Sequence, residues 1–145
     1  MQEMTETDRL ALECQKLAPQ VLALCDILRP QGVRTYPWGK DPRFQVVDFG
    51  DREPSETLYV SERGGVVRHT CEYSGHNGDS YGDEERALPA QECRDRLRGL
   101  HARLTEMAVK AELDRIKRRE DERRLEEAKY LVSCRLARKL GQDVE

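Results

Sequence analysis

The residues best suited to chemistry lie together in the middle of the chain: His69, Cys71 and His76. Zinc takes thiolate and imidazole ligands that converge at about 2.0–2.3 Å, usually from tight CxxC-type turns. The spacing here is H-x-C-x4-H, and a full ligand set would need Cys93 or His101 from a distant segment. Short coincidences of this kind are common, so the pattern favours a half-buried cysteine and two surface histidines. We expect no metal and no cofactor.

Covalent or phosphate chemistry has no better candidate. Cys71 beside a histidine is the single nucleophile–base combination, and nothing around it indicates a thiolate or an oxyanion site. The GxSxG and HExxH patterns are absent, as are the glycine patterns that cradle phosphates. The stretch 77–82 resembles half a calcium loop, but Tyr81 and Leu88 stand where oxygen ligands are needed. The sequence therefore predicts a protein that is not an enzyme.

Three arginines, Arg94, Arg98 and Arg103, lie within three turns of a predicted helix. A basic stripe can grip phosphates, which keeps nucleic-acid binding open as an alternative. Acidic residues are interleaved with these arginines, however, and the whole chain carries a net charge of −3. Alternating charges on a helix ordinarily form a solvated face, and this is what we expect here.

An aromatic pair, Tyr36 and Trp38, interrupts a segment rich in proline and glycine. A tryptophan in such a segment most often closes one end of a core. If it is exposed, the same side chain is a strong anchor for a partner protein, because Trp and Tyr dominate interface energies. We expect the core position for Trp38, and keep both residues as candidates for partner binding.

Composition indicates the elements that must position these residues. The chain has 145 residues, of which 37% are hydrophobic and 37% are charged. This length favours a single domain over 1–145, and the high charge indicates long exposed helix. Five scattered cysteines, without a signal peptide or an apolar run long enough for a membrane, are typical of free thiols in a reducing compartment. We expect no membrane association and a cytoplasmic protein, of its own cell or of a host.

The first half predicts a helix and a small sheet. Apolar residues repeat with spacings of four and three over 5–29, which predicts a helix with one apolar stripe, and Pro19 predicts a kink in it. Residues 30–43 are interpreted as a linker. Three strands are predicted at 44–49, 57–62 and 66–73, and a glycine turn at 63–65 joins the last two as a hairpin. Together they predict a three-stranded antiparallel meander, followed by a polar loop over 74–86.

The last third predicts one long helix over 88–140. Its proximal apolar stripe runs from Leu97 to Ala111 and should pack on the first helix, which we expect to be antiparallel to it. A charged stretch over 117–124 contains no apolar residue. Beyond it an apolar stripe resumes, so that 117–140 either projects or folds back. The candidate partner-binding residues in this distal stripe are Leu125, Val132 and Leu136.

The sequence thus predicts an α+β fold: an N-terminal helix, an antiparallel meander, and a long charged C-terminal helix packed on the first. The function expected is binding of another protein through helical surface. The protein would be an accessory subunit, or an inhibitor encoded by a virus or plasmid that blocks a host machine stoichiometrically. Two alternatives remain open at this point: a self-assembling virion or scaffold component, for example a homodimer through the C-terminal helix, and the nucleic-acid binder described above.

Overall fold

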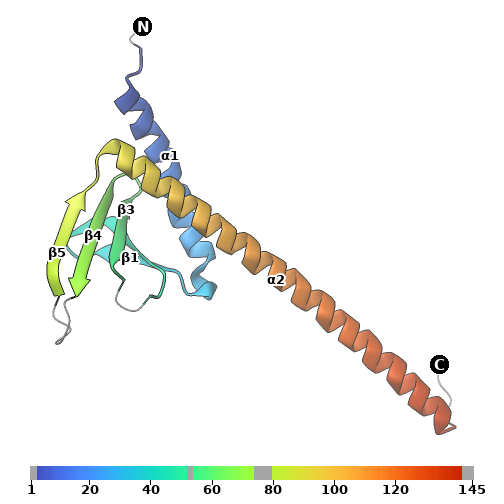
Figure 1. Ribbon diagram of the computed structural model, residues 1–145. Coiled ribbons are helices and arrows are strands. Elements are labelled where there is room, and N and C mark those ends of the chain that lie inside the picture. Colours follow the sequence, from blue (N-terminus) through green and yellow to red (C-terminus); the bar gives the residue numbers. More distant parts are fainter. Residues whose placement is uncertain (1–2, 52–53, 74–79, 142–145) are drawn as a thin grey trace. The chain divides into compact units, whose positions relative to one another are not determined.

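The fold is α+β, as predicted, with more strands than the sequence suggested. A computed structural model describes residues 3–51, 54–73 and 80–141 (Figure 1). The elements in chain order are α1 (Glu6–Ile27), a short 3-10 helix η1 (Arg29–Gln31), β1 (Arg34–Trp38), β2 (Asp41–Asp48), β3 (Glu56–Ser61), β4 (Val66–Tyr73), β5 (Ser80–Ala87) and α2 (Ala90–Lys139). The chain divides into two compact units, 1–108 and 109–145. We call them the body and the distal segment.

Helix α1 begins with a complete capping box. The hydroxyl of Thr5 accepts a hydrogen bond from the amide of Asp8 at 3.1 Å, and the Asp8 carboxylate accepts one from the amide of Thr5 at 3.3 Å. Two orphan amides are thereby satisfied. The helix continues without interruption through Pro19, whose side chain is exposed. The residues that α1 buries are Cys14, Ala18, Val21, Cys25 and Leu28 at its C-cap, which form one stripe with spacings of four and three.

The sheet is a five-stranded antiparallel meander with the order β1-β2-β3-β4-β5. The prediction of a linker over 30–43 is wrong, because this segment contains β1 and the start of β2. Its prolines are compatible with strands for local reasons. Pro37 lies in an edge strand beside a register shift, and Pro42 precedes Phe44, the first residue of β2 paired with β3. At neither position does the hydrogen-bond ladder of a central strand need the backbone N–H donor that proline lacks.

The fifth strand also corrects the prediction of a polar loop over 74–86. Residues 80–87 form β5, which pairs with β4 with a register shift between Thr70 and Glu72. Residues 74–79 lie outside the described part of the chain. The sequence of β5 lacks the apolar alternation of an ordinary half-buried strand, since it is a charged edge strand. Its extended conformation is stabilised by backbone pairing with β4 and not by an apolar face.

The two valine doublets place one residue on each face of the sheet. Val47 and Val66 belong to the main core, whereas Val46 and Val67 belong to a second cluster with Tyr59. Alternation along a strand makes this arrangement inevitable once both faces are covered. The sheet therefore buries apolar residues on both of its faces.

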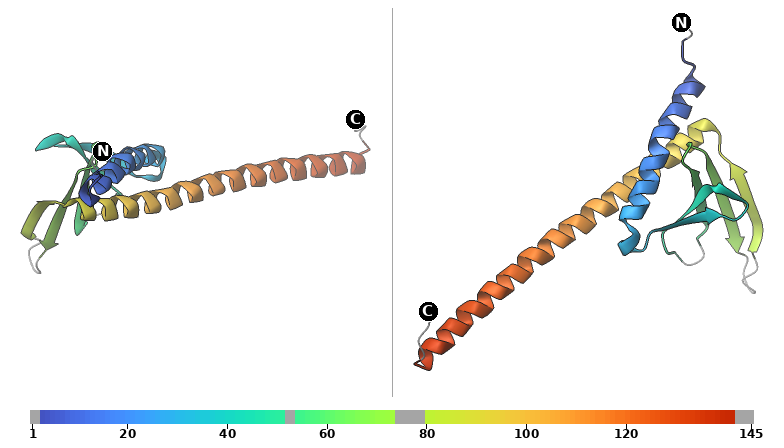
Figure 2. Two further views of the ribbon diagram at one scale, coloured as in Figure 1. Left: turned by 90° about the horizontal axis from the view of Figure 1, so that it is seen from above. Right: turned by 180° about the vertical axis from the view of Figure 1, so that it is seen from behind.

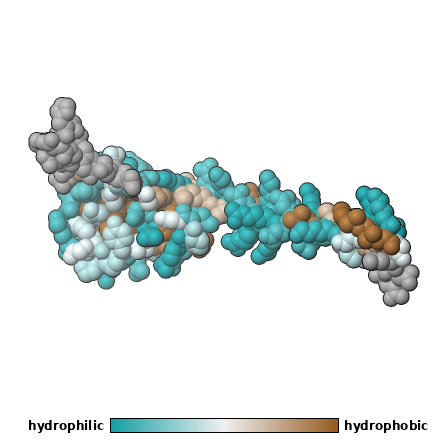
Figure 3. Space-filling view, turned by 90° about the horizontal axis from the view of Figure 1, so that it is seen from below, coloured by the Kyte–Doolittle hydropathy of each residue, from teal (hydrophilic) through white to brown (hydrophobic). Residues whose placement is uncertain are grey.

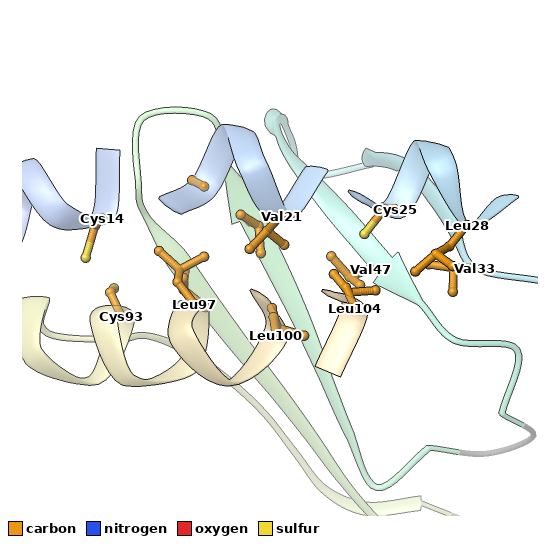
Figure 4. Packing of buried hydrophobic residues seen from close by; sticks show 13 residues of the cluster. Cys14, Val21, Cys25, Leu28, Val33, Val47, Cys93, Leu97, Leu100 and Leu104 are labelled. Atoms are coloured by element: carbon orange, nitrogen blue, oxygen red, sulfur yellow. The ribbon is translucent and has the colours of Figure 1, made fainter. Parts of the chain in front are cut away.

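The main core lies between α1, the start of α2 and one face of the sheet (Figure 4). Helix α2 contributes four buried residues: Cys93, Leu97, Leu100 and Leu104. Figure 2 shows α1 crossing this part of α2 beside the sheet. The packing of the long helix on the first is confirmed, and the proximal stripe supplies it as predicted.

The predicted antiparallel relation of the two helices is wrong. Cys14 lies near the start of α2, with its thiol 3.7 Å from the carbonyl oxygen of Ala90, while Leu28 lies beside Leu104 (Figure 4). The helices thus cross with the same chain direction. The reason is topological: an odd number of antiparallel strands delivers the chain to the end of the sheet opposite its entry. Helix α2 therefore starts beside the N-terminal half of α1.

The predicted hairpin between β3 and β4 is confirmed, and its turn contacts α1 closely. Gly64 has φ +96, and a Cβ atom there would lie 2.7 Å from the backbone carbon of Cys14. Two hydrogen bonds of 2.9 Å close the turn around Ser61. Glycine is thus required twice over, by its conformation and by the space available.

Candidate partner-binding surface

The distal segment carries large apolar side chains that are exposed. Among the described residues 109–141, no residue is buried. The distal stripe, defined as Leu125, Val132, Leu136 and Leu140, has exposed fractions of 55%, 51%, 52% and 72%. At about 100° per residue these four positions fall within an arc of about 80° on the helix. Figure 3 shows brown apolar residues interrupting the teal surface towards the C-terminal end of α2.

Local ion pairs support the helix in this segment. Arg115 lies 3.2 Å from Glu112, and Lys129 lies 3.7 Å from Glu126, both at i,i+3 spacing. Such exposed pairs contribute only about 0.2–0.5 kcal/mol each. Three further exposed apolar residues, Val109, Leu113 and Ile116, lie on another face.

The aromatic candidates separate in the structure. Trp38 packs against the second cluster, with its ring centroid 4.7 Å from that of Tyr59 and 6.0 Å from that of Phe44. It covers the face of the sheet opposite to the helices. Tyr36 is about half exposed on edge strand β1. Trp38 therefore has a packing role, and Tyr36 is the member of the pair that is accessible to a partner.

An ion pair helps to enclose the second cluster. The ammonium group of Lys40, in the turn between β1 and β2, lies 2.9 Å from the carboxylate of Glu85 on β5. These elements stand at opposite ends of the strand order, so the sheet must curl for them to meet. This curl explains how Tyr59 and its neighbours become buried on the face that lacks helices.

The three arginines proposed for nucleic acid do not form one free basic stripe. Arg98 pairs with Glu13 of α1, with its Nε 2.6 Å from the carboxylate. The Arg103 guanidinium lies 3.7 Å from the centroid of the Phe49 ring. Arg94 lies 3.3 Å from Asp95. The three arginines contact different elements, and two of them already have an acidic partner. This arrangement suits a solvated surface of internal ion pairs better than phosphate binding.

The metal candidates are only partly within the described chain. His69 lies on β4, stacked on Tyr59 with ring centroids 6.2 Å apart, and Cys71 follows on the same strand. His76 lies outside the described residues. Within the part of the chain that the structure describes, no group of three or more His, Cys, Asp or Glu side chains is arranged to hold a metal ion.

The buried thiols are held in their neutral form. Burial raises the pKa of Cys25 to about 11, and the neighbouring Asp26 adds to this shift. Burial likewise raises the pKa of Cys14 and of Cys93. The Cys93 thiol donates to the carbonyl oxygen of Leu88 at 3.2 Å. Such cysteines behave as small apolar residues, since the thiolate is the nucleophile and it is disfavoured here.

Sequence reasoning did not indicate the pockets of the body. One of them, a cavity of about 320 Å³ between α2 and the sheet, is lined by apolar residues, by Gly99 and by the charged residues Asp51, Glu56, Asp95, Arg96 and Arg103. Arg96 is already paired with Glu56 at 2.8 Å. Its lining charges come from elements 40 residues apart, so spacing in the sequence gave no signal for it. The mixture of paired acids and bases does not define one ligand class.

Comparison with known proteins identified no relative of this chain. The chain matches no protein-family model, no curated protein and no solved structure. No helix within residues 3–51, 54–73 and 80–141 combines the length and apolar character that crossing a membrane requires. The distal segment is therefore interpreted from its own surface.

Proposed function

We propose that this chain is a non-enzymatic protein that acts by binding another protein through the helical surface of its distal segment. The observation that carries the proposal is the exposed distal stripe. Four large apolar residues on one helix face are about half exposed or more. Exposed apolar residues gathered on one face are typical of interaction sites, whereas single scattered ones are ordinary.

The proposal extends to the biological role expected from the sequence. The protein would serve as an accessory subunit, or as a stoichiometric inhibitor that a virus or plasmid directs against a host machine. Helix-in-groove recognition uses apolar anchors at i, i+3, i+4 and i+7, and the distal stripe has two of these spacings, seven residues from Leu125 to Val132 and four from Val132 to Leu136. The buried neutral thiols of the body support a packing role for these cysteines.

The test is the double variant Val132→Asp with Leu136→Asp. Two carboxylates on the stripe should abolish binding of the partner protein, because burying a charge without a counter-charge costs far more free energy than an apolar contact gains. The body should remain folded, which Trp38 fluorescence reports, since the only tryptophan lies in the body. The matched control is Leu131→Asp, at an exposed apolar residue of the same helix but on another face. Association that survives the double variant would refute the proposal.

A further inference from the structure

The charges around the distal stripe are separated into two blocks. Residues 120–127 contain five acidic and two basic residues, a net charge of −3. Residues 128–141 contain four basic residues and no acidic one, a net charge of +4. The stripe runs through both blocks, from Leu125 in the first to Leu140 in the second. An occupant of this surface should therefore be basic at one end and acidic at the other, in the reverse order.

A second copy of the chain in antiparallel orientation has this charge pattern. It lays the basic block of each helix on the acidic block of the other, while the two apolar stripes face each other. A parallel pair would instead place four positive charges beside four positive charges, which is unfavourable. Antiparallel helices also align their macrodipoles favourably.

We propose that the distal stripe is a homodimer interface in which residues 120–141 of two copies pair as antiparallel helices. Leu125, Val132 and Leu136 form its apolar seam. In the acidic block Asp121 and Glu126 flank this seam, and in the basic block Arg135 and Lys139 flank it, so each block faces the opposite block of the other copy. The inference goes beyond the proposed function, because the occupant of the stripe is a second copy of the chain, and the dimer must dissociate before another protein binds the same surface.

The seam is short, and this sets the expected affinity. It offers about three helical turns of apolar contact, far less than an obligate interface. The charge blocks are exposed, so salt should screen their attraction over a Debye length of about 10 Å at 0.1 M. We therefore expect a dimer that dissociates in the micromolar range and weakens as salt is added.

The first experiment is sedimentation equilibrium of the full chain across micromolar concentrations at low and high salt. A reversible monomer–dimer equilibrium that is lost in Val132→Asp/Leu136→Asp, but kept in Leu131→Asp, supports the proposal. A strictly monomeric parent chain overturns it, as does a dimer that the double variant leaves intact. If the monomeric chain nevertheless binds a different protein through the stripe, the proposed function stands and only the self-pairing falls.

The orientation is tested by reversing charges. The variant Asp121→Lys/Glu126→Lys should weaken the dimer by about tenfold at low salt, because the charge of residues 120–127 changes from −3 to +1 and repels the basic block. Adding Arg135→Glu/Lys139→Glu to the same chain should recover part of the lost affinity, because the charge of residues 128–141 falls from +4 to 0 and this repulsion ends. In a parallel pair the acidic blocks face each other, so the first variant would relieve repulsion and strengthen the dimer. A first variant that leaves the dimer unchanged or strengthens it would therefore overturn the antiparallel arrangement.

Discussion

Helix α2 contains two apolar stripes that read alike in sequence and differ in the folded protein. In the body, Leu97 and Leu104 are completely buried. In the distal segment, Val132 and Leu136 are about half exposed. The body supplies a covering surface for the first stripe, made of α1 and one face of the sheet. Periodicity thus identifies an apolar helix face, while its covering depends on the other elements that the chain can provide.

Ion pairs in the body and in the distal segment also differ, in how far apart the paired residues lie in the chain. Arg98 and Arg96 of the body bind acids that lie 85 and 40 residues away in the chain. In the distal segment the described pairs join residues three positions apart on the same helix. The body therefore has ion pairs that tie distant segments together beside local ones such as Arg94–Asp95, whereas the described pairs of the distal segment join neighbours on one helix.

The largest expected effect concerns the two stripes directly. Leu97→Ala should lower the free energy of unfolding by about 2–5 kcal/mol, because a fully buried leucine leaves a cavity. Leu136→Ala should change it by less than about 0.5 kcal/mol in the monomer, as is usual for an exposed site. Urea denaturation at low protein concentration, followed by Trp38 fluorescence, measures both. Equal losses would mean that the distal stripe belongs to the folded core.

The next effect tests how tightly the body is packed. Gly64→Ala should cost about 2–4 kcal/mol, because its left-handed φ is unfavourable for alanine and the new methyl group meets the backbone of α1. Gly32→Ala is the matched control, since its φ is +97 but nothing lies within 4 Å. It should cost only about 1 kcal/mol. The difference between the two variants measures the contact between turn and helix in thermal or urea unfolding.

If the two glycine variants lost the same stability, the β3–β4 turn could move away from α1 without cost. The comparison between a closely packed body and an open distal segment would then fail at this contact.

The smallest effect concerns the buried thiol of Cys25. Its pKa of about 11 lies above the value of 9.0 for an unperturbed thiol, so the folded protein holds this proton more tightly than the unfolded chain. The stability from this group is complete below about pH 9 and declines as the pH rises towards 11. The loss should reach about 2 kcal/mol. Cys25→Val should show a flatter dependence of unfolding free energy on pH over this range, and identical curves would contradict the assignment.

The helices were predictable because their signals are local. Thr5 and Asp8 form the cap that their spacing indicates, and the proximal stripe of α2 packs on α1 as expected. The relative direction of the helices was not predictable from the stripes, since an apolar face fits either direction. It follows from the odd number of strands between them, and the three predicted strands share this parity with the five observed, so the direction could have been inferred from the meander.

The strands were predicted only where apolar residues were dense. β3 and β4 match their predicted positions closely, but β1 and β5 were missed. β1 contains Pro37 and β5 is mostly charged, and both features are permitted because these are the two edge strands. The doublets Val46-Val47 and Val66-Val67 concealed the second cluster, because a two-sided strand does not alternate in polarity.

Of the candidate site, the sequence predicted the distal stripe and a core position for Trp38, but not which residues Trp38 packs against. The stripe was visible because its residues are separated by charged ones on the same helix. The packing of Trp38 on Tyr59 depends on a curled sheet, which brings Lys40 to Glu85 across 45 residues of sequence. Spacing alone contains no information on that curl.

The edges of the sheet have a further consequence for how copies of this chain meet. Pro37 offers no amide proton to an added strand, and the exposed charges of Glu84 and Arg86 line the other edge. Proteins use both devices against strand addition, the route to domain swapping and amyloid-like fibres. Open-ended growth through the sheet is thereby disfavoured at each end, and the helical surface remains as the route to a closed, finite assembly.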